Sequence, residues 1–362
     1  MKRVIQSAAV ERDPAFSAAL IVWQKQHGRH QLPWQQTRDA YRIWLSEIML
    51  QQTQVSTVIP YYHRFLQHFP TVGALAAAPL EQVMSLWAGL GYYTRARNLH
   101  RCAQVVMQQH AGVFPSEVAA LAALPGIGPS TAAAIAAFAY GQRAAILDGN
   151  VKRVLCRVFG IAGFPGQLAV ERQLWQLASA LLPAHEIEAY TQGLMDLGAT
   201  VCTRTRPRCA ECPWQARCVA KQTERIAELP TPRPKKVTPE KHSVMLWIVY
   251  ADQLLLEQRP PSGIWGGLQS LPELVRLGGN PDATDLHAEV QLALADIGEI
   301  AELRVLPEFR HAFTHFRLRV TPLQIKLKRR YTLAAQAALF WQATAALDTA
   351  ALPAPVRKLL TG

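Results

Sequence analysis

Long apolar runs are absent from this sequence of 362 residues. It contains no uninterrupted apolar stretch of about 18 residues, the length that a membrane-spanning helix needs. Lys2 and Arg3 at the N-terminus are not followed by an apolar segment. A secretory signal would have such a segment. We therefore expect a cytoplasmic protein without a membrane partner, and a hydrophobic content of 50% is ample for folded cores.

Strand-like alternation is absent before residue 240, so the first part of the chain is expected to be all-helical. Apolar residues recur at helical spacing there, between short loops that contain Pro or Gly. This periodicity predicts helices over residues 14–27, 40–51, 53–68, 79–88, 95–110, 116–124, 130–140, 148–158, 169–182 and 186–199.

Further along the chain the pattern changes. Four prolines between Ile226 and Lys241 alternate with basic residues, which predicts a stiff linker. The sequence beyond it predicts an α+β domain with strands over 242–250, 254–258 and 316–327 and helices over 284–297 and 332–338. We therefore predict two domains, residues 1–225 and 242–362, joined by a linker over 226–241.

Acidic residues are scarce relative to basic ones. The chain has 38 Lys and Arg against 26 Asp and Glu, a formal net charge of +12. Basic side chains that neutralise phosphates release counterions and provide affinity that does not depend on base sequence. The charge therefore favours a polyanionic partner such as a nucleic acid.

The segment 121–135 predicts two helices joined by a sharp turn that contains Gly126 and Gly128. Glycines let a partner approach the backbone, and Pro129 suits the first position of the second helix. The free amides at that helix start could bind a phosphate. A helix-hairpin-helix of this kind would hold DNA by its backbone, although an ordinary αα-hairpin fits the same residues.

Glu47 is the first candidate catalytic residue. It is predicted to lie on the helix over 40–51, beside the apolar face that contains Trp44 and Ile48. Apolar surroundings would raise its pKa, as a proton donor near neutral pH requires. A solvated helix residue is the alternative. Asp148, which follows the hairpin, is a second acid.

Two tyrosines, Tyr92 and Tyr93, lie on a glycine turn that precedes Arg95 and Arg97. Aromatic side chains there could wedge into a base stack while the arginines meet phosphates. An aromatic turn packed against the core is equally consistent with these residues.

Four of the six cysteines lie within residues 202–218. Four thiolates on a compact loop could hold one iron–sulfur cubane or one tetrahedral zinc ion. The spacing favours the cluster and leaves zinc open. The four residues are Cys202, Cys209, Cys212 and Cys218.

Several longer motifs, taken together, closely resemble those of the MutY adenine DNA glycosylases of the endonuclease III-like helix-hairpin-helix superfamily. They are residues 46–54 (SEIMLQQTQ), 89–99 (GLGYYTRARNL) and 146–153 (ILDGNVKR), with the four-cysteine loop. The resemblance covers nearly the whole chain. It implies an enzyme that removes adenine mispaired with 8-oxoguanine or guanine from double-stranded DNA in base excision repair.

The resemblance also implies roles for single residues. Glu47 matches the general acid that protonates adenine, and Asp148 matches the aspartate that stabilises the sugar cation, with Asn150 close to the pair. The same division of labour between two carboxylates operates in glycoside hydrolysis. Ser130 stands where bifunctional relatives have a lysine that attacks the sugar, so it gives at most catalytic support, and we predict a monofunctional glycosylase.

The cysteines match the ligands of a [4Fe–4S] cluster, and Gln52 and Tyr92 match residues that insert into the duplex, with Gly126 and Gly128 as further DNA contacts. The resemblance thus implies an all-α helix-hairpin-helix glycosylase domain with an iron–sulfur loop. We expect it to act as a monomer on chromosomal DNA.

The C-terminal domain resembles the Nudix-like domain of the same family. Gly267 and Glu273 begin a Nudix box, but Pro281 and Asp282 stand where Arg-Glu is needed for magnesium-dependent hydrolysis. The domain is therefore expected to recognise the lesion. Phe313, Thr314 and His315 match a Phe-Ser-His loop that recognises 8-oxoguanine, with threonine in place of serine.

Two other functions are weighed against this one. A non-enzymatic iron–sulfur protein that binds DNA and senses redox state would not need Glu47 and Asp148. An endonuclease III-like bifunctional glycosylase and lyase would need an amine nucleophile, which Ser130 lacks.

Overall fold

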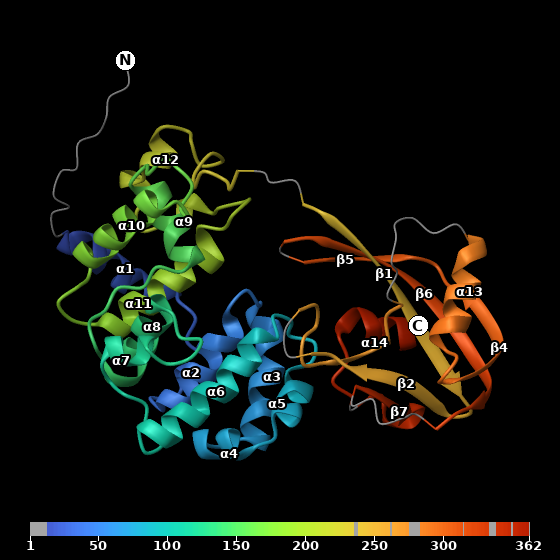
Figure 1. The fold of residues 1–362 in the computed structure, drawn as a ribbon. Coiled ribbons are helices and arrows are strands. Elements are labelled where there is room, and N and C mark those ends of the chain that lie inside the picture. The colour runs from blue at the N-terminus through green and yellow to red at the C-terminus, as the bar shows by residue number, and fades with distance from the viewer. Residues whose placement is uncertain are drawn as a thin grey trace. The chain divides into compact units, whose positions relative to one another are not determined.

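The computed structural model describes residues 13–234, 238–260, 263–274, 283–313, 315–332, 338–348 and 350–361. The chain folds into two compact units (Figure 1). The first unit comprises residues 1–77 and 98–235, and the second comprises residues 78–97 and 236–362. None of the helices in the described residues is long and apolar enough to cross a lipid bilayer.

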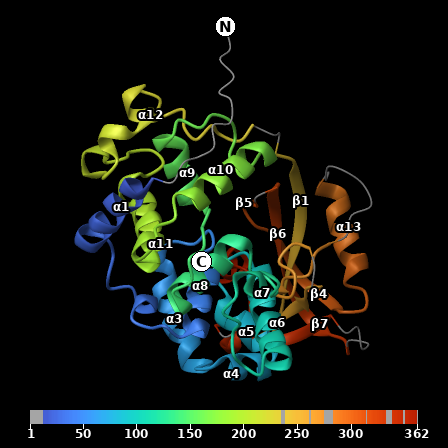
Figure 2. The ribbon, with the colours of Figure 1, turned by 90° about the vertical axis from the view of Figure 1, so that its left-hand side faces the viewer.

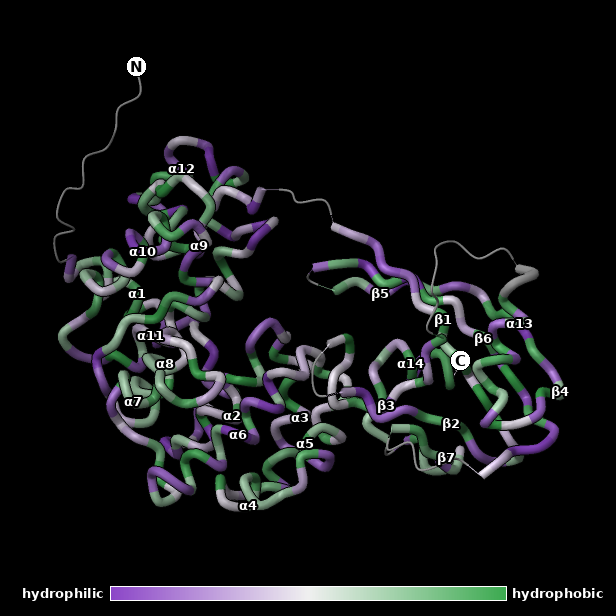
Figure 3. Tube along the Cα trace, in the orientation of Figure 1, coloured by the Kyte–Doolittle hydropathy of each residue, from purple (hydrophilic) through white to green (hydrophobic). Residues whose placement is uncertain are grey.

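The first unit is helical. All of the helices predicted in it are present within a few residues of their expected ends, together with two short ones, α4 and α12, that the sequence does not predict. Its α-helices are α1 (Pro14–His27), α2 (Ala40–Leu50), α3 (Val55–His68), α4 (Val72–Ala77), most of α6 (Thr94–Gln109), α7 (Val118–Ala122), α8 (Pro129–Tyr140), α9 (Gly149–Val158), α10 (Leu168–Ala180), α11 (Ile187–Asp196) and α12 (Val219–Gln222). Figure 3 shows hydrophobic and hydrophilic residues alternating along these helices, as amphipathic packing requires.

Local signals account for several helix ends. Asp13 caps α1 by accepting a hydrogen bond from the backbone N–H of Phe16 at 3.0 Å, and Pro14 occupies the first helical turn. Asp148 caps α9 in the same way. Gly141 ends α8 in the left-handed conformation that glycine adopts readily.

In the core of the first unit, the N-terminal helix α1 packs against the loop that contains the four cysteines. The ring of Phe16 on α1 stacks on Trp214, with centroids 3.9 Å apart. The Trp214 indole N–H donates to the carbonyl oxygen of Phe16 at 3.1 Å. Both side chains are almost fully buried, so the loop that contains the cysteines is packed against α1.

The second unit contains α5 (Leu80–Trp87) and a seven-stranded mixed sheet of order β3-β2-β1-β6-β4, in which β5 pairs with β6 and β7 with β2. Only the pairing of β1 with β6 is parallel among the described strands. The strands are β1 (Glu240–Tyr250), β2 (Gln253–Gln258), β3 (Gln269–Ser270), β4 (Gly298–Val305), β5 (Phe309–Ala312), β6 (Arg317–Arg330) and β7 (Leu339–Ala343).

Two helices cover the sheet. Leu286, Val290 and Leu294 of α13 (Ala283–Ala293) and the turn after it pack on a core that includes Leu246 and Ile325. On β1 the alternate residues Trp247 and Val249 line a separate cavity with α14 (Ala354–Thr361). Because successive strand residues point to opposite faces, α13 and α14 lie on opposite sides of the sheet (Figure 1), and Figure 2 shows α13 beside the sheet.

The three predicted strands and the helix over 284–297 are confirmed, and the first of the strands, β1, begins two residues earlier than predicted. The strands β3, β4, β5 and β7 and helix α14 were not predicted. The helix predicted over 332–338 lies mainly outside the described residues.

The two units differ in one respect from the domain limits predicted above. Residues 78–97 group with the C-terminal residues, and within this unit the Gln269 side-chain amide donates to Glu81 at 3.2 Å. The predicted limits at 225 and 242 remain predictions.

Candidate active site

Glu47 lies on α2 within an apolar environment. Its neighbours Trp44, Ser46 and Ile48 are almost fully buried, while Glu47 itself is partly exposed and lines a cavity of about 570 Å³. Burial, with a smaller contribution from the negative charge of Asp148, raises the pKa of Glu47 to about 8. The side chain therefore retains a proton at neutral pH, as a general acid must.

Asp148 is held by the start of α9. Its Oδ1 accepts from the backbone N–H of Val151 at 2.8 Å, and the Asn150 side-chain amide donates to Oδ2 at 3.4 Å. Burial raises the pKa of Asp148, and these hydrogen bonds and the charge of Arg153 oppose that shift. Because Asp148 also raises the pKa of Glu47, the structure brings the two predicted acids close together.

Asn150 links Asp148 to the cysteine loop. Its Oδ1 accepts from Arg153 Nη2 at 2.8 Å, and Arg153 Nε donates to the carbonyl oxygen of Cys202 at 2.8 Å. Arg153 also donates to the carbonyl oxygen of Gly198. The predicted supporting residue thus belongs to a continuous hydrogen-bonded chain that fixes the orientation of its amide.

Ser130 contributes through the backbone. It lies in the first turn of α8, and its hydroxyl oxygen accepts from the N–H of Leu147 at 3.0 Å. Leu147 directly precedes Asp148. The position of the catalytic loop is therefore tied to the helix that follows the hairpin.

Replacing Ser130 with alanine is expected to lower the free energy of unfolding by about 1 kcal/mol, because the amide of Leu147 loses its acceptor. Threonine, which keeps the hydroxyl, is the matched control. Urea denaturation of the full-length protein measures the difference. Equal stability of the alanine variant and the wild type would contradict this role of Ser130.

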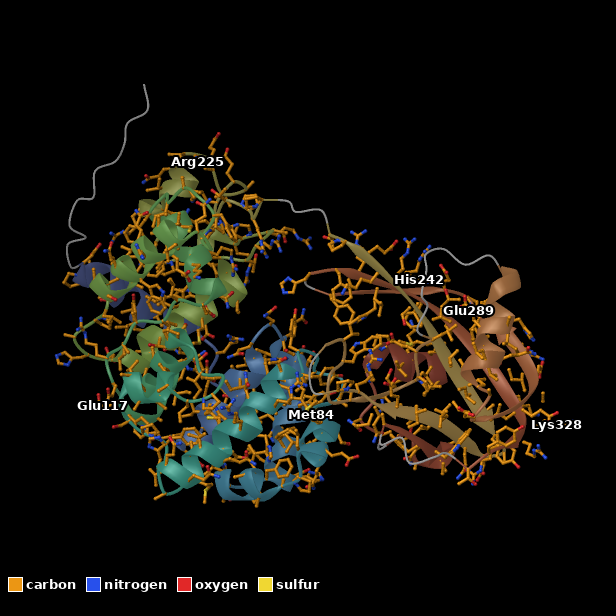
Figure 4. The ribbon with its side chains drawn as sticks, viewed as in Figure 1. Met84, Glu117, Arg225, His242, Glu289 and Lys328 are labelled. Carbon is orange, nitrogen blue, oxygen red and sulfur yellow. The ribbon has the colours of Figure 1, made fainter. Side chains whose placement is uncertain are left out.

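The predicted hairpin joins α7 and α8. Gly126 has φ of +78°, and a Cβ at this position would lie 2.8 Å from the Cβ of Asn98. Only glycine fits such a position. At Gly128 a Cβ would meet no described atom within 4 Å, so the backbone there is open to a partner. Glu117, the residue before α7, is labelled in Figure 4.

Gln52 and Tyr92 share an unusual backbone. Gln52 has φ of 58° and Tyr92 has φ of 50°, values that residues other than glycine rarely adopt. Both residues are exposed. The turn of Tyr92 is held by the Trp87 indole N–H, which donates to the carbonyl oxygen of Gly91, and by Arg95, which lies 5.5 Å from the Tyr92 ring. Strained positions of this kind are concentrated at binding sites.

The four predicted cysteine ligands line a single cavity together with Val154, Arg157 and Leu197. None of the four forms a disulfide, and Arg157 Nη1 donates to Cys202 Sγ at 3.5 Å. In the described part of the chain, no group of three or more His, Cys, Asp or Glu side chains is arranged so that it could hold a metal ion. The donor set, four thiols beside an arginine, nevertheless fits an anionic iron–sulfur cluster by its chemistry.

The predicted recognition loop of the second unit begins in an aromatic cluster. Phe313 stacks on Phe316 with centroids 4.5 Å apart, and it contacts His311 and Trp265 edge-on or tilted. His315 is exposed. Thr314 lies outside the described residues, as do Pro281 and Asp282. Of the Nudix-box residues, Glu273 is paired with Arg259 at 2.8 Å.

Sequence reasoning missed the other walls of the cavity beside Glu47. They come mainly from the segment between α1 and α2 and from α11, with one residue each from α1 and α8. Gln192 and its neighbour one turn later, Asp196, are buried polar residues of α11. That i, i+4 spacing is a usable signal, but their partner Arg29 lies 167 residues away from Asp196.

Comparisons with known proteins agree with this arrangement. The HhH-GPD superfamily of base excision DNA repair proteins matches residues 45–180, and the NUDIX domain matches residues 244–362. The adenine DNA glycosylase of Buchnera aphidicola (Baizongia pistaciae) is 34% identical over 347 residues, which cover 96% of both chains. The human adenine DNA glycosylase is 35% identical, and the aligned region covers 84% of this chain and 65% of the human protein.

Solved structures resemble the helical part. A thermostable thymine-DNA glycosylase is 29% identical, with a TM-score of 0.52, and covers 58% of this chain and 96% of its own. Endonuclease III in complex with DNA is 21% identical, with a TM-score of 0.50, which shows a shared fold. The predicted two-part fold, helix-hairpin-helix and Nudix-like, and the resemblance that implied it are both confirmed. The chain belongs to the adenine DNA glycosylase family.

Proposed function

We propose that this protein hydrolyses the N-glycosidic bond of adenine paired with 8-oxoguanine or guanine in double-stranded DNA and leaves an abasic site. The observation that carries the proposal is Glu47, which lines a cavity of about 570 Å³ and whose pKa is raised by burial and by the charge of Asp148. A cavity of this volume is within the size range of small-ligand pockets. A base inside a duplex cannot reach such a cavity, so adenine must flip out of the stack.

The two acids divide the chemistry. Glu47, protonated up to a pH of about 8, donates a proton to the adenine ring and makes it a better leaving group. Asp148, which accepts hydrogen bonds from Val151 and Asn150, supplies negative charge to the developing sugar cation. Water then adds to the sugar, as in other glycoside hydrolyses.

Ser130 supports a monofunctional reaction. Its hydroxyl oxygen is already the acceptor for Leu147, and a serine cannot form a Schiff base with the sugar. The protein should therefore break the base–sugar bond without cutting the strand.

The remaining predicted residues are assigned to DNA. Gln52 and Tyr92 would insert into the duplex and offset the energy of flipping, and the hairpin glycines would approach a phosphate. Phe313, Thr314 and His315 would recognise 8-oxoguanine, with Phe313 supported by its aromatic neighbours. We propose that the protein acts as a monomer within the cell.

We propose further that Cys202, Cys209, Cys212 and Cys218 hold a [4Fe–4S] cluster, because all four line one cavity. The cluster would fix the fold of this loop when bound. Cys212→Ser is expected to lower the iron and acid-labile sulfide content of the purified protein and its melting temperature. Cys102→Ser, a buried cysteine outside the cavity, is the control. Full iron content in Cys212→Ser would contradict the assignment.

The rate of excision should depend on pH through Glu47. Because burial raises the pKa of Glu47 to about 8, the acid is protonated and active below that pH. We expect the single-turnover rate to fall as pH rises through about 8, by up to tenfold for each further pH unit. A rate that keeps rising between pH 7 and 9 would contradict protonated Glu47 as the active form.

The proposed function is tested with duplexes that contain adenine opposite 8-oxoguanine, guanine or thymine. Strand breaks that appear only after alkali treatment, in the 8-oxoguanine and guanine duplexes, support a monofunctional adenine glycosylase. Breaks without alkali would indicate a lyase. Tight binding of all duplexes without any breaks would instead support a non-enzymatic DNA-binding protein.

A further inference from the structure

Within the second unit, residues 78–97 contact the loop over residues 263–268. Arg97 Nη1 donates to the carbonyl oxygen of Gly266 at 2.5 Å. A Cβ at Gly267 would lie 3.4 Å from Arg97 Nη1 and 3.7 Å from the methyl carbon of Met84, which is labelled in Figure 4. The backbone of the loop therefore lies directly against the Arg97 side chain.

The same arginine is tied to the turn that contains Tyr92. Arg97 Nη2 donates to Thr94 Oγ1 at 3.1 Å, and the backbone N–H of Arg97 donates to the carbonyl oxygen of Tyr93 at 3.3 Å. Arg97 is partly buried, whereas Tyr92 is exposed. The guanidinium therefore joins the residues that follow Tyr92 to the loop at Gly266.

Trp265, which precedes Gly266, contacts the predicted recognition loop. Its ring centroid lies 5.8 Å from that of Phe313 and 6.0 Å from that of His311. Trp265 is 6% exposed and has φ of +52°, a conformation that a bulky residue rarely adopts. Such strain persists only where the surroundings hold the residue, and it is concentrated at functional sites. In this conformation the indole contacts Phe313 while the next carbonyl, that of Gly266, contacts Arg97.

The proposed wedge and the proposed recognition loop thus belong to one unit. A continuous series of contacts joins them, from the turn of Tyr92 through Arg97, Gly266 and Trp265 to Phe313. Neither Arg97 nor Trp265 is one of the residues assigned to a base. Parts that are already held at the correct spacing need not be ordered when the duplex binds, and this preorganisation leaves more free energy for insertion.

We propose that Arg97 and Trp265 are positioning residues that hold the proposed wedge, Tyr92, at a fixed distance from the recognition loop. Binding of 8-oxoguanine by the loop then places the wedge for insertion, so excision of adenine is accelerated more opposite 8-oxoguanine than opposite guanine. This inference rests on the proposed function. It assigns part of the discrimination between the two pairs to contacts within the protein.

Arg97→Met tests the inference. Methionine keeps an unbranched stem but cannot donate to Gly266 or to Thr94. Single-turnover rates are measured on duplexes with adenine opposite 8-oxoguanine or opposite guanine. The ratio of the first rate to the second is expected to fall by about tenfold, the effect of one lost hydrogen bond from a charged donor. The rate opposite guanine should change little.

Arg101→Met controls for the loss of a positive charge. Arg101 lies on the same helix, α6, and is exposed. Loss of a phosphate contact should slow both duplexes alike and lower the slope of the salt dependence of binding by about one. Arg97→Met should instead lower the rate ratio and leave the salt slope unchanged, whereas Arg101→Met should keep the wild-type ratio.

A double-mutant cycle separates coupling from independent damage. Phe313→Leu removes the ring that contacts Trp265. In the Phe313→Leu protein, Arg97→Met should lower the rate ratio little further, because the series of contacts is already broken. The effects of independent residues would multiply. If Arg97→Met does not fold, Arg97→Lys, which keeps the charge but loses the planar fork that reaches two acceptors, takes its place in the cycle.

An unchanged rate ratio in Arg97→Met, equal slowing of both duplexes, or multiplication of the two effects in the double variant would overturn the inference. These outcomes leave the proposed function intact, because the wild type still excises adenine. A wild type that removes adenine from neither duplex would overturn the proposed function and this inference with it.

Discussion

Replacing Glu47 with glutamine is expected to slow adenine excision by about 10²–10⁴-fold, the usual contribution of general acid catalysis. Glutamine keeps the shape of the side chain but cannot supply the proton that burial retains on Glu47 up to a pH of about 8. The leaving adenine would then depart as a poor, unprotonated leaving group. Single-turnover kinetics with enzyme in excess measure the loss without interference from slow product release.

Glu188→Gln is a matched control for this variant. Glu188 lines the same cavity, but it is exposed at the surface and pairs with Arg38 at 2.7 Å. Exposed ion pairs contribute little, so this change should leave the rate near that of the wild type. Comparable losses in both variants would mean that cavity charge in general, and not the proton of Glu47, drives excision. Duplex binding by Glu47→Gln should persist.

Replacing Asp148 with asparagine is expected to lower the rate of excision by about 10²–10³-fold, because the sugar cation loses its negative counterpart. The fold should survive the change. Asparagine caps helices about as well as aspartate, so it can still accept from the N–H of Val151. The loss should therefore appear in the single-turnover rate while the melting temperature changes little.

Asp39→Asn provides the control for Asp148→Asn. Asp39 caps α2 as Asp148 caps α9, accepting from the N–H of Tyr41 at 2.9 Å. The same substitution at an equivalent cap should leave the excision rate almost unchanged. A near-wild-type rate in Asp148→Asn would show that the charge of this carboxylate is not used in the transition state.

Much of the helical part can be predicted because its signals are local. The helix predicted over 14–27 has the same two ends as α1, because Pro14 marks its first turn and Gly28 follows its last residue. The short helix α4 was missed because six residues, Val72–Ala77, span too few turns to show a period.

The sheet was predicted less completely. The strands β1 and β6 have buried residues that reveal them, whereas β4 is mostly exposed and shows no regular apolar alternation. The parallel pairing of β1 with β6 joins residues more than 70 positions apart, such as Glu240 and Arg317, and no local pattern encodes it.

The site shows the same limit. The motif around Glu47 identified the acid, but the proximity of Asp148 and the resulting pKa depend on tertiary packing. Gln192, Asp196 and Arg29 carry no motif, and they meet only because α11 packs beside the start of the chain. The sequence identifies Ser130 as a residue without the amine that a lyase needs. Its hydrogen bond with the N–H of Leu147 is visible only in the structure.

The most direct test of the central claim is the release of free base from a duplex with one adenine opposite 8-oxoguanine, measured by mass spectrometry in a single turnover. The account predicts stoichiometric free adenine and an intact abasic strand with the wild type, and almost none in the same time with Glu47→Gln. Equal release by both proteins would contradict Glu47 as the proton donor, and release of any other base in place of adenine would contradict the proposed function.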